Sequence, residues 1–100
     1  MYAKQVFWEA VSALATDTGS IQDRLAAAAG SNGPGLIKIA FHVDEQLPEE
    51  YRDEFRAIWG ELLKEGTTIA ATTHTMTDAQ ARKLAERIFN LFVGIMGGLA

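Results

Sequence analysis

The sequence predicts a single all-α domain over residues 1–100, a small bundle of four to five helices. Apolar residues recur at steps of three and four along most of the chain, which is the spacing of one helix face. Helix-capping residues and glycines separate these stretches from one another. One hundred residues are enough for one domain and too few for two.

The first helix is expected over residues 2–16, because its apolar residues fall on one helix face. These residues are Ala3, Phe7, Ala10, Val11 and Leu14. Trp8 lies beside this face, at the edge of the expected core. Gly19 ends the helix region, since glycine readily takes the positive φ found after a helix C-terminus.

A second helix is expected over residues 21–29. The hydroxyl of Ser20 can cap it, and Asp23 adds a negative charge in its first turn. It ends in four alanines, whose small side chains allow a neighbouring helix to approach closely. Residues 30–35 then contain three glycines and a proline, which predicts a loop. This loop lacks the spacing of phosphate-binding glycine motifs.

Residues 36–43 fit two patterns. Alternating apolar residues are typical of a half-buried strand, which would pair with residues 67–75 as a two-stranded ribbon and give an α+β fold. The alternating residues are Ile37, Ile39, Phe41 and Val43. A helix face also fits, through Leu36, Ile39, Ala40, Val43 and Leu47. We favour the helix, because an isolated ribbon is only marginally stable in water.

A third helix is expected from Pro48 to Lys64. Proline suits the first helical position, where its missing N–H costs nothing, and the two glutamates that follow complement the helix dipole. The apolar stripe of this helix is Leu47, Tyr51, Phe55, Ile58 and Leu62. Gly66 is the expected C-terminal glycine.

Threonines mark the starts of the last two helices. Thr67 or Thr68 can cap a short helix that runs to Met76. Thr77 and Gln80 have the spacing of a capping box, which predicts that the final helix starts there.

The final helix changes character at Asn90. Before this residue it has a polar face, formed by Arg82, Lys83, Glu86 and Arg87. From residue 91 to residue 100 no side chain carries a charge or a hydrogen-bonding group. At 1.5 Å per residue this apolar run is about 15 Å long, roughly half the hydrocarbon core of a bilayer, so no transmembrane segment is expected.

Two apolar stripes run along the final helix. One is a seam of Ala81, Ala85, Ile88, Phe92, Ile95 and Leu99, and the other consists of Phe89, Val93 and Met96. Two stripes exceed what one flank of a small bundle covers, which indicates a contact with a second copy. The protein's own core, another protein and a lipid surface are the alternatives. The predicted interface is Phe89, Phe92, Val93, Gly94, Ile95, Met96 and Leu99, with Trp8 and Trp59 as further contact residues.

The order of several short motifs resembles that of short, uncharacterised bacterial helical proteins. These motifs are Asp23-Arg24-Leu25, Leu47-Pro48-Glu49-Glu50, Arg52-Asp53-Glu54-Phe55, Ile69-Ala70-Ala71-Thr72 and Ala85-Glu86-Arg87-Ile88. The resemblance covers most of the chain. It implies a helical fold and a bacterial source, and it implies no particular activity.

Charge and cysteine content narrow the function classes. The formal net charge of -4 disfavours attraction to nucleic-acid phosphates, so no nucleic-acid partner is expected. The absence of cysteine excludes disulfides and thiolate metal sites. Lys4 and Glu9 interrupt the apolar residues near the N-terminus, unlike in a signal peptide, and we therefore expect a cytoplasmic protein.

Few residues suggest catalysis or metal binding. His42 and His74 are the only histidines, whereas a zinc site needs three or four ligands. The carboxylates of residues 49–54 lie where a helix dipole and a solvated helix face place them. We expect no cofactor, no metal ion and no catalytic residue, and we favour a non-enzymatic role.

The predicted function is that of an interaction module that self-associates through its C-terminal helix, as a dimer in the simplest case. Another protein is the alternative partner. The competing hypothesis is a small-ligand-binding or enzymatic helical protein with a site near His42 or His74.

Overall fold

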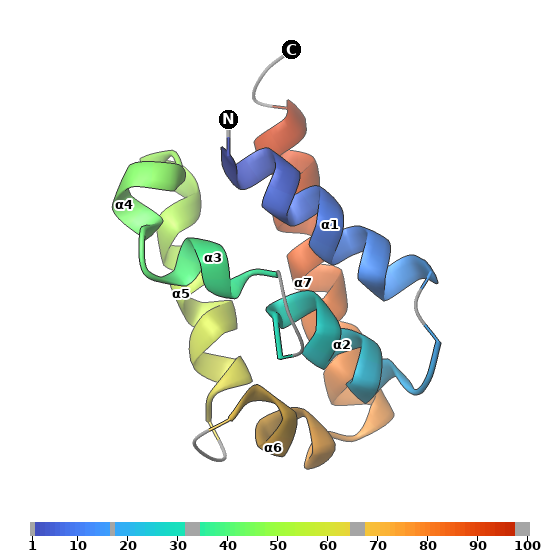
Figure 1. Cartoon of the computed structure of the whole chain (residues 1–100). Helices are drawn as coiled ribbons and strands as arrows, with labels where there is room; N and C mark the ends of the chain where they lie inside the picture. Colours follow the sequence, from blue (N-terminus) through green and yellow to red (C-terminus); the bar gives the residue numbers. More distant parts are fainter. Residues whose placement is uncertain (1, 17, 32–34, 65–67, 98–100) are drawn as a thin grey trace.

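Seven helical segments make up the part of the chain that the computed structural model describes, residues 2–16, 18–31, 35–64 and 68–97 (Figure 1). Four are long, namely α1 (Tyr2–Thr16), α2 (Ile21–Ala29), α5 (Glu49–Leu62) and α7 (Asp78–Gly97). Three are short, namely α3 (Ile37–Ala40), α4 (Val43–Gln46) and α6 (Ile69–His74). No strand occurs in these ranges, which confirms the predicted all-α class.

The alternative α+β fold is therefore wrong. Of the two segments that would have formed its ribbon, residues 36–43 contain α3 and the start of α4, and residues 67–75 contain α6. The predicted helix face is buried at Leu36, Ile39, Val43 and Leu47. The helix is interrupted between α3 and α4, where Phe41 is 77% exposed.

Helix α7 lies at the centre of the bundle and contacts α1, α2 and α5. Figure 1 shows α1 and α7 side by side and antiparallel, with α2 against both of them. Helix α6 crosses beneath the adjoining ends of α5 and α7 and contacts α2. None of the described helices is both long enough and apolar enough to cross a bilayer.

The core lies between the long helices. Phe7 of α1 and Phe55 of α5 meet edge to face, with their ring centroids 6.0 Å apart. The largest fully buried aliphatic side chains around them are Leu25, Leu36, Ile39, Ile58, Leu62 and Ile88. The predicted apolar faces of α1, α5 and α7 thus supply much of the core.

The predicted caps define most helix starts. Ser20 and Asp23 form a capping box at α2, and Thr77 and Gln80 form another at α7, where each backbone N–H donates to the other side chain. Thr68 caps α6. Pro48 directly precedes α5 rather than forming its first residue.

Gly19, predicted to follow the first helix, has φ 104°, and Gly30, the first residue of the predicted loop, caps the C-terminus of α2 with φ 107°. Gly66, Leu99 and residues 32–34 of the predicted loop lie outside the described residues.

Candidate functional site

The predicted interface residues of α7 lie on different sides of the helix. Ile95 is only 3% exposed and packs in the protein's own core with Ile88 and Leu91. Gly94 faces α5, where the Tyr51 hydroxyl donates a hydrogen bond of 2.8 Å to the Gly94 carbonyl. Ile95 is therefore buried and Gly94 partly covered within the chain, and the predicted Leu99 lies outside the described residues.

Phe89, Val93 and Met96 lie on the flank of α7 beside α1 and remain 49%, 49% and 42% exposed. Trp8 of α1, 61% exposed, has its ring centroid 6.3 Å from that of Phe92. The ring centroid of Phe92 in turn lies 6.5 Å from that of Phe89. We call this surface the α1–α7 face; it consists of Trp8, Phe89, Phe92, Val93 and Met96. Among the described residues it holds four of the six exposed large hydrophobic side chains.

A groove of about 400 Å³ adjoins the α1–α7 face. Its apolar lining comes from three helices and consists of Val11, Leu14, Ala15, Ile21, Ala85 and Phe89. Glu86 and Asn90 are its polar lining residues. Phe89 belongs to both surfaces, so the groove and the α1–α7 face form one continuous apolar area.

Sequence reasoning predicted Trp8 as a contact residue of α1 but missed the other α1 residues of this area, Val11, Leu14 and Ala15. Trp8, Val11 and Ala15 are three and four residues apart, and this spacing places them on one helix face. That pattern was visible in the sequence, but it did not reveal that this face lies beside the exposed stripe of α7. The contact between Trp8 and Phe92 depends on how the two helices pack.

The second tryptophan lies elsewhere. Trp59 of α5 is half-buried and stacks on Phe55, with the ring centroids 6.2 Å apart and the planes 8° from parallel. It lines a separate pocket of about 340 Å³ with Phe41 and His42. The structure does not bring Trp59 together with Trp8.

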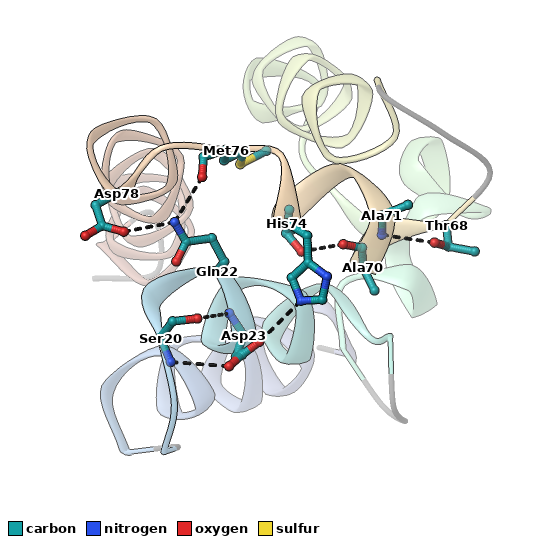
Figure 2. Close-up of polar contacts among 10 residues, drawn as sticks. Ser20, Gln22, Asp23, Thr68, Ala70, Ala71, His74, Met76 and Asp78 are labelled. Atoms are coloured by element: carbon teal, nitrogen blue, oxygen red, sulfur yellow. Dashed lines mark hydrogen bonds and ion pairs between the residues drawn. The ribbon is translucent and has the colours of Figure 1, made fainter.

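The two histidines also lie apart, on different elements. His42 precedes α4, and its Nδ1 is 3.9 Å from Glu45 Oε1. His74 ends α6, and its Nε2 is 3.5 Å from Asp23 Oδ1 of α2 (Figure 2). The described residues contain no group of three or more side chains that could hold a metal ion.

Polar contacts around His74 hold α2 against the turn between α6 and α7 (Figure 2). Gln22 Nε2 donates to the Met76 carbonyl at 3.0 Å and to Asp78 Oδ1 at 2.9 Å. Hydrogen bonds from the backbone and side chain of Ser20, and then the contact with His74, lower the pKa of Asp23. Asp23 therefore stays ionised at neutral pH and caps α2, which is a structural role.

Comparisons of the chain with protein-family models, with curated proteins and with solved structures found no match. The functional argument consequently depends on the chain's own surfaces.

Proposed function

We propose that this chain is a non-enzymatic interaction module that self-associates through the α1–α7 face. The observation that carries this proposal is the clustering of exposed apolar side chains from α1 and α7 on one surface. Single exposed hydrophobic residues are common on soluble proteins, whereas a contiguous apolar area beside a groove is typical of an interaction site.

The shape of this area favours a second copy of the chain as the partner. A twofold-symmetric dimer requires one surface that is complementary to itself. Here protruding aromatic side chains and an apolar groove lie next to each other. A twofold axis between them would place the aromatic side chains of each copy over the groove of the other.

The charges at the two ends of the area support the same arrangement. Lys4 lies one turn before Trp8 on α1, and Glu86 lines the groove near the other end of the area. Neither side chain forms an ion pair with a described residue. An antiparallel pairing of two copies would bring Lys4 of one copy toward Glu86 of the other, and complementary charges of this kind fix the register of an interface.

We expect the dimer to be weak. A standard interface buries about 800 Å² per partner, which is more than five partly covered side chains supply. A dissociation constant of roughly 10–100 µM is consistent with such an area.

Sedimentation equilibrium from low to high micromolar concentration tests the proposal. We expect wild type to show a reversible monomer–dimer equilibrium and Phe89→Glu to remain monomeric. Phe41→Glu is the matched control, because it places the same charge at an exposed phenylalanine away from the α1–α7 face, and it should dimerise like wild type. A monomeric wild type at several hundred micromolar, or equal effects of the two substitutions, would refute the proposal.

The competing ligand-binding or enzymatic hypothesis has less support. His42 does line a pocket, but the nearby Asp44 carboxylate lies 2.6 Å from Arg56 Nη2. The hydrogen bond and charge of Arg56 lower the pKa of Asp44, which therefore does not hold a proton at neutral pH. Asp44 is thus held as an ion-pair partner of Arg56 rather than as a proton donor beside His42.

A further inference from the structure

A cleft of about 520 Å³ lies on the opposite flank of α7, where α5, α6 and α7 meet. Its size is within the range of small-molecule sites. Helix α7 lines it with four residues at the spacing of one helix face, Gln80, Lys83, Leu84 and Arg87. Glu61 and Lys64 line it from the end of α5 and the turn beyond, and Thr72, Thr75 and Met76 from α6 and the turn that follows.

The cleft carries more positive than negative charge in a chain whose net charge is negative. Of the described residues that line it, three are cations and one, Glu61, is a carboxylate. Arg87 is already paired, since its Nη2 and Nε donate to Glu54 at 2.7 and 3.1 Å. Lys64 and Lys83 form no ion pair with any residue that the structure describes. Two ammonium groups are therefore available to a ligand.

Further N–H donors and an apolar side chain line the cleft beside these charges. Gln80 uses its Oε1 to accept the Thr77 N–H at 2.9 Å, which leaves its amide nitrogen without an acceptor among the described residues. Arg87 likewise keeps Nη1 after its two bonds to Glu54. Leu84 is 5% exposed and provides apolar contact area beside these donors. An excess of N–H donors without acceptors matches the oxygen atoms of an anionic group.

We propose that this cleft binds a small anionic ligand through a phosphate or carboxylate group, with Lys83 and Lys64 as the charged contacts and Gln80 as a neutral donor. This site is independent of the α1–α7 face, which lies across α7. The module would thus combine a self-association surface with a small-molecule site.

Titration of the full chain with inorganic phosphate and with citrate at low ionic strength, followed by ¹H–¹⁵N correlation spectra, tests this proposal. We expect saturable shifts of the backbone amides of Thr75, Gln80 and Lys83 at millimolar ligand. If only phosphate gives saturable shifts, the group that the cleft binds is a phosphate. If only citrate gives them, the group is a carboxylate.

The matched variants are Lys83→Met and Arg82→Met. Each removes one positive charge from an exposed position of α7, but only Lys83 lines the cleft. Lys83→Met should weaken binding about tenfold, because hydrogen bonds to charged groups contribute strongly. Arg82→Met should weaken it less than about twofold, since its charge is screened from the cleft. Absence of saturable shifts with both ligands, or equal losses in the two variants, would overturn the proposal.

Discussion

Two glycines inside helices have different surroundings. A Cβ atom on Gly94 would lie 3.0 Å from Cε1 of Tyr51, whose ring packs against α7 at this point. A Cβ atom on Gly60 would have no neighbouring atom within 4 Å. The missing side chain of Gly94 therefore makes room for Tyr51, whereas that of Gly60 only lowers helix propensity.

Substitution of each glycine by alanine separates the two effects. Gly60→Ala is expected to raise the free energy of unfolding by about 0.5–1 kcal/mol, the difference in helix propensity. Gly94→Ala gains the same propensity but must displace Tyr51, so it should be less stable than Gly60→Ala by about 1 kcal/mol or more. Urea denaturation measures both values.

Tyr51→Ala provides the control for this comparison. In that background the contact at Gly94 is gone, and both alanine substitutions should stabilise the chain equally. A Gly94→Ala protein as stable as Gly60→Ala, in the presence of Tyr51, would show that the ring moves aside without cost.

At the scale of the helices, one ion pair connects α5 to α7. Two guanidinium nitrogens of Arg87 donate to the two oxygens of Glu54, a geometry that is stronger than a single contact. These hydrogen bonds, together with the charge of Arg87, lower the pKa of Glu54 below its ordinary value of 4.5. Glu54 is 43% and Arg87 33% exposed, so solvent screens the pair.

The direction of this pKa shift predicts how acid affects stability. The carboxylate has a lower pKa in the folded chain than in the unfolded chain. The pair consequently stabilises the fold above the unfolded pKa and loses this effect as pH falls through the folded pKa. Between neutral pH and about pH 3, the free energy of unfolding should fall more in wild type than in Glu54→Gln, by up to about 1 kcal/mol.

Asp53→Asn is the neighbouring control. It removes a carboxylate from an exposed position of α5 that forms no ion pair with the described residues. Its loss of stability in acid should match that of wild type. If Glu54→Gln and wild type lose the same stability, the pair contributes nothing to the fold.

Caps and apolar periodicity predicted the helices well, because both depend on local sequence. Ser20, Thr68 and Thr77 each cap a helix as expected. The interface residues were harder to predict, because an apolar side chain looks the same in sequence whether it faces the core or solvent. Ile95 and Met96 are adjacent apolar residues of α7, and only the packing of α1, α2 and α5 around that helix buries the first and exposes the second.

The cleft between α5, α6 and α7 could not be predicted from the sequence, for a related reason. Lys83 and Arg87 could be placed on one face of a helix, but Lys64 is distant in the chain. It lies near them because α5, whose C-terminal end it follows, packs against α7. Arg87 also has its partner, Glu54, on another helix, 33 residues away in sequence.

For the whole molecule, association and folding are linked through α7. Leu91 and Ile95 in its C-terminal half are buried, so deleting this half would damage the core together with the α1–α7 face. Point substitutions of exposed residues avoid that problem. With such variants, the dependence of the melting temperature on protein concentration can be used to measure association.

The melting temperature of wild type is expected to rise with protein concentration, because a dimer formed only by folded chains shifts the folding equilibrium by mass action. The melting temperature of Phe89→Glu should not change over the same range, and that of Phe41→Glu should follow wild type. Scanning calorimetry at several concentrations gives these values. A melting temperature of wild type that is independent of concentration would contradict the link.

The different positions of the two tryptophans give the chain two built-in fluorescent reporters. Trp8 is largely exposed on the α1–α7 face, so its access to a soluble quencher depends on whether that face is covered. Trp59 stacks on Phe55, which is buried, so its emission depends on whether the core is intact. With Trp8 replaced, the remaining emission follows unfolding, and with Trp59 replaced it follows association, so unlabelled protein can be monitored for both.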